Sequence, residues 1–310
     1  METVNMQTKC CNKKPVVFRK HENRSYCKQH FMESIEAKVR KTVGTARMIS
    51  SHDRIAFALS GGKDSSVVLC IMHKFLKNRR DIGYFAVTID EGIAGYRNKS
   101  LPVAKKLCKG LGIEHYICSY KGGYGKTLDE KVEEKRKAGE RTAPCSFCGV
   151  ARRHMLNKAA KELGATKLCV GHNLDDEVQS IIMNYLRGDL ARASRIGTVT
   201  ASREEGFIKR IKPLRFIPEK EVALYAYLAG LETQHEDCPY ASGMRFDVRD
   251  FLNELENRYP GTKFAIIGTF EKIREGIRRL ETPSGKLRPC EACSEPTSQT
   301  VCKACELWRY

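Results

Sequence analysis

The chain of 310 residues lacks any long apolar run, and its first segment has no apolar stretch of the kind that forms a secretory signal. A membrane-spanning helix needs about 20 consecutive apolar residues, so the sequence predicts a soluble, cytoplasmic protein with no membrane partner. Acidic residues are also scarce, with 37 against 55 lysines and arginines, and the formal net charge is +18. Such an excess favours a nucleic-acid partner, because each neutralised phosphate releases counterions.

The phosphate-binding motif G-x-x-x-x-G-K-[ST] is absent as well, but a different glycine-rich turn is present. SGGKDSS (60–66) follows an apolar run and precedes a segment with a helical pattern. Two glycines permit a sharp turn that exposes backbone N–H groups, and the start of a helix adds free N–H donors and the positive end of its dipole. This turn is therefore a candidate pyrophosphate site, and an ordinary strand-to-helix turn is the structural alternative.

Short apolar runs alternate with helical patterns through the first half of the chain. Strands are predicted at RIAFAL (54–59), GYFAVTID (83–90), EHYICSY (114–120) and TKLCVG (166–171). Strands separated by helices predict an α/β fold with a parallel sheet and helices on both faces. Ligands of such folds bind beyond the carboxyl ends of the strands. The SGGKDS turn, the acidic turn after Ile89 and the GHNLDD turn follow strands in this way, so we expect them to meet in one crevice.

The second half of the chain has fewer strand patterns. After Leu186 it is rich in glycine, arginine and serine, and we predict a mobile basic loop there. Three later segments have helical patterns: EKEVALYAYLAGL, VRDFLNELENRY and KFAIIGTFEKIREGIRRL.

Cysteine is abundant, with 14 residues. Cytosolic thiols stay reduced, so paired cysteines are interpreted first as metal ligands. The C-terminal string C-x2-C-x8-C-x2-C supplies four thiolates, which predicts a tetrahedral zinc site at Cys290, Cys293, Cys302 and Cys305, with an iron–sulfur site or disulfides as the alternatives. Four single cysteines in apolar surroundings are interpreted as small core residues: Cys70, Cys108, Cys118 and Cys169.

The SGGKDS string resembles the PP-loop, S-G-G-x-D-S, of the N-type ATP pyrophosphatases, which split ATP between its α and β phosphates and leave an adenylated carbonyl. The resemblance implies that pyrophosphate is held by Ser60, Gly61, Gly62, Asp64, Ser65 and Ser66, with Lys63 beside it. Asp64 is then the residue expected near Mg²⁺. Metal charge and backbone donors would stabilise the departing pyrophosphate.

The resemblance also assigns ATP contacts to other turns. In GHNLDDEV it implies roles for Gly171, His172 and one of two aspartates, Asp175 or Asp176; we favour Asp176 as catalytic or metal-binding. Capping of the following helix, in which Asn173 can share, is a structural alternative for these carboxylates. It also places Asp90, Glu91 and Gly92 along the nucleotide pocket, and Ala58 and Leu59 against the adenine.

The segment TAPCSFCGVARRHMLNKAAKELGATKLCVGHNLDDEVQSIIMNYLRGD resembles the tRNA 2-thiolation branch of that family, and the likeness extends over nearly the whole chain. It implies that Cys145, Cys148 and Cys238 hold an iron–sulfur cluster of [4Fe–4S] type. Three thiolates leave one iron open, whereas a structural metal site uses four ligands. A catalytic disulfide with a persulfide and a zinc site are the alternatives. Arg152 and Arg153 would meet phosphate or the activated intermediate, or form an exposed helix face.

The branch usually carries C-x2-C followed by C-x2-H near its N-terminus. This chain keeps Cys27 and His30, but its first pair is adjacent, Cys10 and Cys11, and Thr8 stands where the first cysteine is expected. We still expect zinc at these four ligands, with His21 as an alternative ligand. Aromatic residues near basic ones would stack on bases or simply pack, namely Phe18, Tyr26, Phe31 and Trp308.

The resemblance implies a tRNA-uridine 2-sulfurtransferase that uses ATP, Mg²⁺, the cluster and two Zn²⁺. Adenylation would turn the uracil C2 oxygen into a leaving group that sulfur displaces, at wobble position 34 or, alternatively, at uridine or ribothymidine 54. Cytidine thiolation, lysine addition and a zinc-dependent RNA-binding module are rivals; the three cysteines argue against lysine addition, and SGGKDS against a mere binding module. A ubiquitin-like carrier or free sulfide would supply sulfur, and a homodimer is expected.

These expectations divide the chain into four parts. They are an N-terminal zinc module (1–34), a PP-loop core (35–200), a helical part of the catalytic domain (201–284) and a C-terminal zinc ribbon (285–310).

Overall fold

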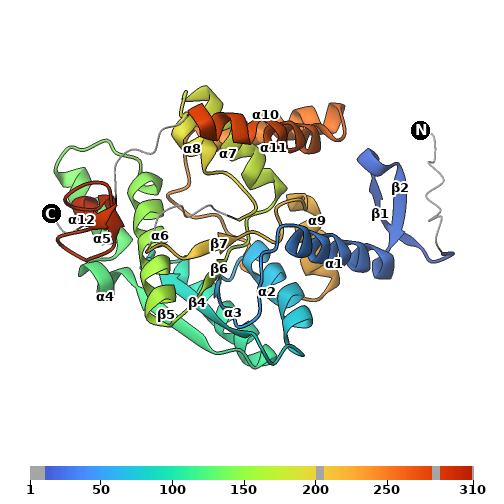
Figure 1. The fold of residues 1–310 in the computed structure, drawn as a ribbon, viewed down its shortest axis with the longest axis horizontal. Coiled ribbons are helices and arrows are strands. Elements are labelled where there is room, and N and C mark those ends of the chain that lie inside the picture. Colours follow the sequence, from blue (N-terminus) through green and yellow to red (C-terminus); the bar gives the residue numbers. More distant parts are fainter. Residues whose placement is uncertain (1–10, 200–205, 281–286, 309–310) are drawn as a thin grey trace.

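The structure is a computed structural model that describes residues 11–199, 206–280 and 287–308 (Figure 1). Its strands are β1 (Pro15–Arg19), β2 (Arg24–Cys27), β3 (Arg54–Ala58), β4 (Gly83–Asp90), β5 (His115–Ser119), β6 (Lys167–Cys169), β7 (Lys209–Ile211), β8 (Arg288–Pro289) and β9 (Pro296–Thr297). Its helices are α1 (Lys28–Thr45), α2 (Lys63–Leu76), α3 (Arg97–Leu111), α4 (Tyr120–Tyr124), α5 (Leu128–Lys137), α6 (Pro144–Glu162), α7 (Leu174–Leu186), α8 (Leu190–Ser194), α9 (Glu219–Leu228), α10 (Met244–Arg258), α11 (Thr262–Leu280) and α12 (Lys303–Trp308), with a 3-10 turn at Lys20–Glu22.

The central sheet has five parallel strands in the order β5-β4-β3-β6-β7. From β3 the chain proceeds outward through β4 to β5, and then returns to the other side of β3 for β6 and β7. The direction of winding therefore reverses between β3 and β6, and the crevice at such a reversal is where open α/β sheets bind ligands. The turns after β3 and β6 are the SGGKDS and GHNLDD turns.

Alternate residues of the strands face opposite layers. Ile55 and Phe57 join a core with α1, α2, α3 and α9, whereas Ala56 and Phe85 join a core with α4, α5, α6 and α12. Helices thus cover both faces of the parallel sheet, as the sequence predicts. A third apolar cluster joins α7, α8, α10 and α11, which gather in one group beside the sheet in Figure 1.

The β1–β2 hairpin and α12 lie at opposite ends of the molecule (Figure 1). At one end the buried guanidinium of Arg19 donates two hydrogen bonds to Glu221 of α9, at 3.0 and 2.8 Å. At the other end the indole N–H of Trp308 donates to the carbonyl of Phe147 on α6, at 3.2 Å. Buried polar contacts therefore fasten both peripheral segments to the central layers.

Three parts of the fold differ from the sequence prediction. The described part of the segment after Leu186, for which we predicted a loop, contains α8, and Val199 pairs with Ile211 in an antiparallel bridge. Strand β7 and the β1–β2 hairpin were not predicted. The helical patterns of the second half are confirmed as α9, α10 and α11, although α10 begins earlier, at Met244. No helix in the described ranges is long and apolar enough to cross a membrane.

Candidate functional site

The SGGKDS turn joins the end of β3 to the start of α2. The Ser65 hydroxyl accepts the backbone N–H of Ser60 at 3.1 Å and lies 3.0 Å from the Ser60 hydroxyl, which in turn accepts the N–H of Gly62 at 3.2 Å. These bonds hold the turn closed over the first turn of α2, whose leading N–H groups have no acceptor within the helix. Ser66 is fully buried beneath the turn. The geometry suits an anion at the helix N-terminus.

Two positions around this turn require glycine, because a Cβ there would lie too close to neighbouring backbone atoms. Gly61 has φ +86°, and a Cβ there would lie 2.4 Å from the carbonyl oxygen of Ser100. A Cβ on Gly171, at the end of β6, would lie 2.8 Å from the carbonyl carbon of Asp64. The GHNLDD turn therefore sits directly against the SGGKDS turn, as the sequence predicts.

Asp64 and Asp176 meet through Asn173. The Asn173 amide donates to Asp64 at 2.9 Å, while its oxygen accepts the N–H of Asp176 at 3.1 Å in the capping box of α7. Burial raises the pKa of Asp64; Lys63 opposes this rise and the charge of Asp176 adds to it. Burial also raises the pKa of Asp176, against the lowering effect of Arg245. Two partly exposed carboxylates held this close form a donor set suited to Mg²⁺.

The neighbouring Asp175 has a structural role. It is buried, accepts the N–H of Glu219 at 2.7 Å, and pairs with Lys263 of α11. Lys63 is held between Asp64, at 3.2 Å, and Glu219, at 2.7 Å. The capping interpretation of GHNLDD is therefore confirmed, and the capping network leaves Asp176 partly exposed at the crevice. His172 is exposed at the same edge.

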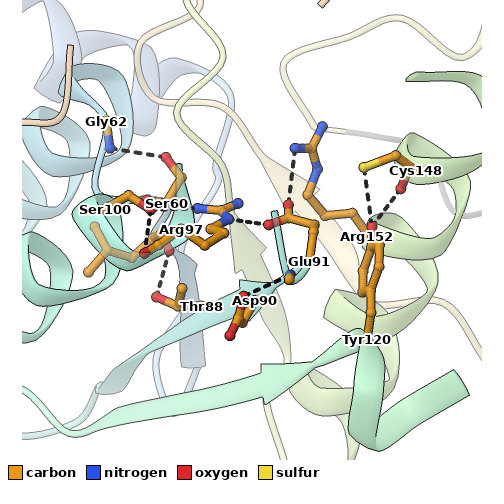
Figure 2. Close-up of polar contacts among 12 residues, drawn as sticks. Ser60, Gly62, Thr88, Asp90, Glu91, Arg97, Ser100, Tyr120, Cys148 and Arg152 are labelled. Atoms are coloured by element: carbon orange, nitrogen blue, oxygen red, sulfur yellow. Dashed lines mark hydrogen bonds and ion pairs between the residues drawn. The ribbon is translucent and has the colours of Figure 1, made fainter. Parts of the chain in front are cut away.

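A chain of polar contacts leads from the SGGKDS turn to α6 (Figure 2). Arg97, at the start of α3, donates to the Ser60 carbonyl at 3.1 Å and pairs with the buried carboxylate of Glu91. The other oxygen of Glu91 faces the guanidinium of Arg152 at 3.4 Å. Figure 2 shows Glu91 between the two arginines, with Cys148 and the phenol of Tyr120 on the far side of Arg152.

The three central cysteines come together from two segments. Cys145 and Cys148 lie on the first turns of α6, and the Cys145 thiol donates to the carbonyl of Tyr240, two residues beyond Cys238, at 3.1 Å. The Gln234 N–H donates to the Gly61 carbonyl at 2.9 Å, which brings the segment that carries Cys238 beside the SGGKDS turn. Burial raises the pKa values of Cys148 and Cys238, and Arg152 opposes both rises.

The C-terminal cysteines form a compact group. The sulfurs of Cys290, Cys293, Cys302 and Cys305 all lie within 4.8 Å of one another. The Cys302 N–H donates to the Cys290 sulfur at 3.2 Å. Burial acts to raise the pKa of Cys290, but hydrogen bonds from the backbone N–H groups of Cys302, Ala292 and Cys293 lower it to about 6. Four thiol groups so gathered fit a tetrahedral metal.

At the N-terminal site Cys11, Cys27 and His30 also lie within 4.8 Å of one another. Cys10 and Thr8 fall outside the described residues. His21 packs instead against Phe264 of α11, with ring centroids 4.7 Å apart, so it is not a ligand in this arrangement. Over residues 11–199, 206–280 and 287–308, these two groups are the ones with three or more such atoms within 4.8 Å; the three central cysteines are spread more widely.

The remaining predicted residues lie as follows. Asp90 ends β4, and Glu91 and Gly92 follow it at the crevice, where the Asp90 carboxylate accepts the Gly92 N–H at 2.9 Å. Ala58 is partly buried at the end of β3, and Leu59 is buried in the core beneath it. Cys70, Cys108 and Cys169 are buried core residues, and Cys118 is half-buried on the edge strand β5. Phe31 and Trp308 are buried and pack, and Phe18 and Tyr26 are half-buried on the hairpin.

Sequence reasoning missed Arg97, which links the SGGKDS turn to Glu91. Its position six residues after Glu91, at the start of a helix, was the available signal. Glu219 was also missed, because its contact with Lys63 joins residues 156 positions apart.

Comparisons with known proteins agree with this geometry. Residues 31–239 match the family model described as PP-loop domain. The tRNA 2-thiolation protein NcsA of Haloferax volcanii is 37% identical over 317 residues, covering 97% of this chain and 98% of that protein. The tRNA-5-methyluridine(54) 2-sulfurtransferase of Pyrococcus horikoshii is 34% identical, with coverage of 98% and 94%. The cytoplasmic tRNA 2-thiolation protein 1 of Danio rerio is 35% identical, with coverage of 96% and 86%.

Among solved structures, the U34-tRNA thiolase NcsA from Methanococcus maripaludis with its [4Fe-4S] cluster superposes with a TM-score of 0.84. It is 34% identical, and the match covers 99% of this chain and 96% of that one. The chain therefore belongs to the PP-loop family. Its relatives within that family are sulfurtransferases and tRNA 2-thiolation proteins.

Proposed function

We propose that the chain adenylates the C2 oxygen of uridine 34 in tRNA and replaces that oxygen with sulfur. The observation that carries the proposal is the polar chain from Ser60 through Arg97 and Glu91 to Arg152, because it joins a pyrophosphate turn to a three-cysteine set across one crevice. ATP-dependent tRNA thiolation needs both halves, and the names of two relatives state tRNA thiolation.

The SGGKDS turn would support the first half-reaction, adenylation of the uridine oxygen. The uridine oxygen attacks the α-phosphorus of ATP, and pyrophosphate leaves toward the start of α2. Asp64 and Asp176 would hold Mg²⁺ there, since Asn173 keeps both carboxylates together at the crevice. Charge on the departing phosphates is then offset by metal, Lys63 and helix N–H groups. Gly61, Gly62, Ser60, Ser65 and Gly171 shape the turn.

The second half-reaction belongs to the cysteines. The all-sulfur donor set of Cys145, Cys148 and Cys238 suits an iron–sulfur cluster. Their wider spread suits it better than a single ion, because each thiolate of a cluster binds a different iron. A bound [4Fe–4S] cluster would leave one iron with an open position for a sulfur ligand. The Arg152 cation, fixed by Glu91, would then offset negative charge where sulfur meets the adenylated base, and AMP leaves with the original oxygen.

Positive charge around the crevice suits the tRNA backbone. Arg210 of β7 lies against α6, with its guanidinium 3.5 Å from the carbonyl of Arg153. Desolvation, and then the charge of Arg153, lower the pKa of Arg210 to about 10. Arginines held close enough to repel one another are stabilised by phosphate.

Other parts of the assignment rest on the same family likeness. The C-terminal and N-terminal cysteine groups would each hold Zn²⁺, the latter with Cys10 as the fourth ligand. A ubiquitin-like carrier or free sulfide would supply the sulfur. The protein would act as a homodimer. We place the protein in the cytoplasm, the compartment named for the Danio rerio relative.

The second candidate is thiolation of position 54, which the name of the Pyrococcus horikoshii relative favours. Anaerobically reconstituted protein should be incubated with ATP, Mg²⁺, sulfide and three tRNAs: unaltered, with cytidine at 34, and with cytidine at 54. Thiolated tRNA is retarded in a mercury-containing gel. Loss of the shift only with cytidine 34 supports position 34, and loss only with cytidine 54 moves the target. No shift with unaltered tRNA, although the cluster is intact, contradicts thiolation from sulfide.

A further inference from the structure

Helix α6 connects two of the cysteine sites. Its first turns carry Cys145 and Cys148, and further along the same helix the imidazole Nε2 of His154 lies 3.4 Å from the sulfur of Cys293. The other ring nitrogen, Nδ1, lies 2.7 Å from the phenol oxygen of Tyr124. The Tyr124 hydroxyl also lies 3.4 Å from the carbonyl of Ala151, so this phenol fixes the imidazole with its Nε2 directed at the sulfur, as outer hydrogen bonds fix groups at metal sites.

A second contact ties the C-terminal segment to α6. The buried amide of Asn157 donates to Glu295 at 2.5 Å, while its oxygen accepts the N–H of Ile208 at 3.0 Å. Glu295 lies between the two cysteine pairs, and its carbonyl accepts the N–H of Cys290 at 2.9 Å. Asn157 is therefore hydrogen-bonded to Glu295, and the backbone carbonyl of Glu295 in turn holds Cys290 of the four-cysteine group.

A third contact reaches the turn that carries Cys148. Trp308, three residues after Cys305, donates to the carbonyl of Phe147, and its ring packs at 4.8 Å from that of Tyr120. The Tyr120 hydroxyl donates to the carbonyl of Cys148 at 2.7 Å. Trp308 and Tyr120 thus hold two consecutive carbonyls of α6, those of Phe147 and Cys148. One member of this aromatic pair, Trp308, comes from the C-terminal segment.

We propose that the C-terminal four-cysteine site is a positioning element for the central cysteines, with His154 as the side chain that joins them. The proposal rests on the proposed function only in taking Cys145, Cys148 and Cys238 as the cluster site. The apolar cluster around the four C-terminal cysteines is small, and modules of this size take their order from the bound metal. Zinc would order this segment, and the ordered segment would hold the Cys148 turn through Trp308, Glu295 and Cys293.

The linkage works in both directions, because coupling free energies between two sites are reciprocal. Zinc should stabilise the closed form of α6 around Cys148, and a cluster at the central cysteines should raise the affinity of the C-terminal site for zinc. A purely local role for His154 predicts neither effect.

The test compares His154→Phe, which removes the N–H, with His154→Gln, which keeps a donor, and with Lys158→Gln, an exposed change on the same helix. Full-length protein is loaded anaerobically with zinc, iron and sulfide. Zinc loss to a chelator is timed, and the cluster is followed by visible circular dichroism. We expect His154→Phe to speed zinc loss by about 10-fold or more, the size found for outer-shell changes at metal sites, and to alter the cluster spectrum. His154→Gln should restore most of both, and Lys158→Gln should change neither. Faster zinc loss with an unaltered cluster spectrum would overturn the coupling.

Hydrogen exchange separates this proposal from the proposed function, because it requires no cluster and no tRNA. Amides of residues 147–151 are compared in zinc-loaded and zinc-free protein, each without iron. Faster exchange in the zinc-free form is expected, and equal exchange would refute the coupling. Failure of the unaltered protein to bind a cluster would instead count against the proposed function.

Discussion

Glu91 and Arg152 form an ion pair at 3.4 Å across the crevice, although 61 positions separate them in the sequence. The Glu91 carboxylate is almost fully buried, whereas the Arg152 side chain is half exposed. Glu91 therefore acts as a fixed anchor, since Arg97 holds its other oxygen. The exposed part of Arg152 lies between Glu91 and Cys148 (Figure 2).

Arg152→Gln should separate the two half-reactions. The change removes a cation from the sulfur side and leaves the SGGKDS turn intact, so tRNA-dependent pyrophosphate release should persist. Thiolation should slow by about 100-fold, the scale of a lost donor at a developing charge. Pyrophosphate and thiolated tRNA are measured in the same reaction, with Lys158→Gln as the control on α6. An equal loss of both products would show that Arg152 serves adenylation instead.

Asp64→Asn should abolish pyrophosphate release while raising thermal stability at neutral pH. The raised pKa of Asp64 means that the folded chain disfavours its charge, so the ionised carboxylate costs stability above that pKa. The gain in melting temperature should vanish as the pH falls and the carboxyl group is protonated in both states. Differential scanning calorimetry at several pH values checks this, with Asp250→Asn, an exposed change, as the control. A lower melting temperature at neutral pH would contradict the burial argument.

The raised pKa values of Asp64 and Asp176 also set the acid side of the pH profile. Both carboxylates must be ionised to hold Mg²⁺, and burial keeps their protonated forms to a higher pH than is usual for aspartate. The rate of pyrophosphate release should therefore fall, as the pH is lowered, before it reaches the ordinary aspartate range near about 4. A higher Mg²⁺ concentration should move this fall in rate to lower pH. A fall in rate that does not depend on Mg²⁺ would argue against a metal-binding role for the two carboxylates.

Gly61→Ala and Gly62→Ala should differ in stability. The first places a Cβ 2.4 Å from the Ser100 carbonyl at φ +86°, whereas the second meets its nearest atom at 3.4 Å. We expect Gly61→Ala to lower the free energy of unfolding by about 1–3 kcal/mol, and Gly62→Ala by far less. Urea titration measures both, and equal losses would contradict the described turn.

Cys145→Ser should remove the cluster absorbance together with thiolation and leave pyrophosphate release unchanged. Cys70→Ala, a buried change in the opposite core, is the control. A Cys145→Ser protein that keeps its absorbance but loses activity would favour the persulfide alternative.

The sequence predicted the parallel sheet and the meeting of the SGGKDS and GHNLDD turns, because the signals are local. The apolar runs before SGGKDS and GHNLDD predicted strands, and the capping role of Asn173 followed from its place before α7. Strand β7 was not predicted because it has only three residues, Lys-Arg-Ile, which show no alternation of apolar and polar side chains.

Contacts between distant segments explain the other misses. Nothing local indicates that Arg19 pairs with Glu221, or that His21 rests on Phe264 instead of joining Cys27. Trp308 was assigned either to RNA or to packing, and only the fold places it on Phe147 beside the Cys148 turn. The central cysteines were found from their motif, but their link to the pyrophosphate turn through Arg97 needed the structure.

The most direct test follows the fate of the uridine oxygen. A tRNA that carries a heavy oxygen isotope at C2 of uridine 34 is thiolated in a single turnover, and the AMP is analysed by mass spectrometry. Adenylation of that oxygen predicts AMP with one heavy atom for each thiouridine formed. Thiouridine formation accompanied by unlabelled AMP would contradict the account.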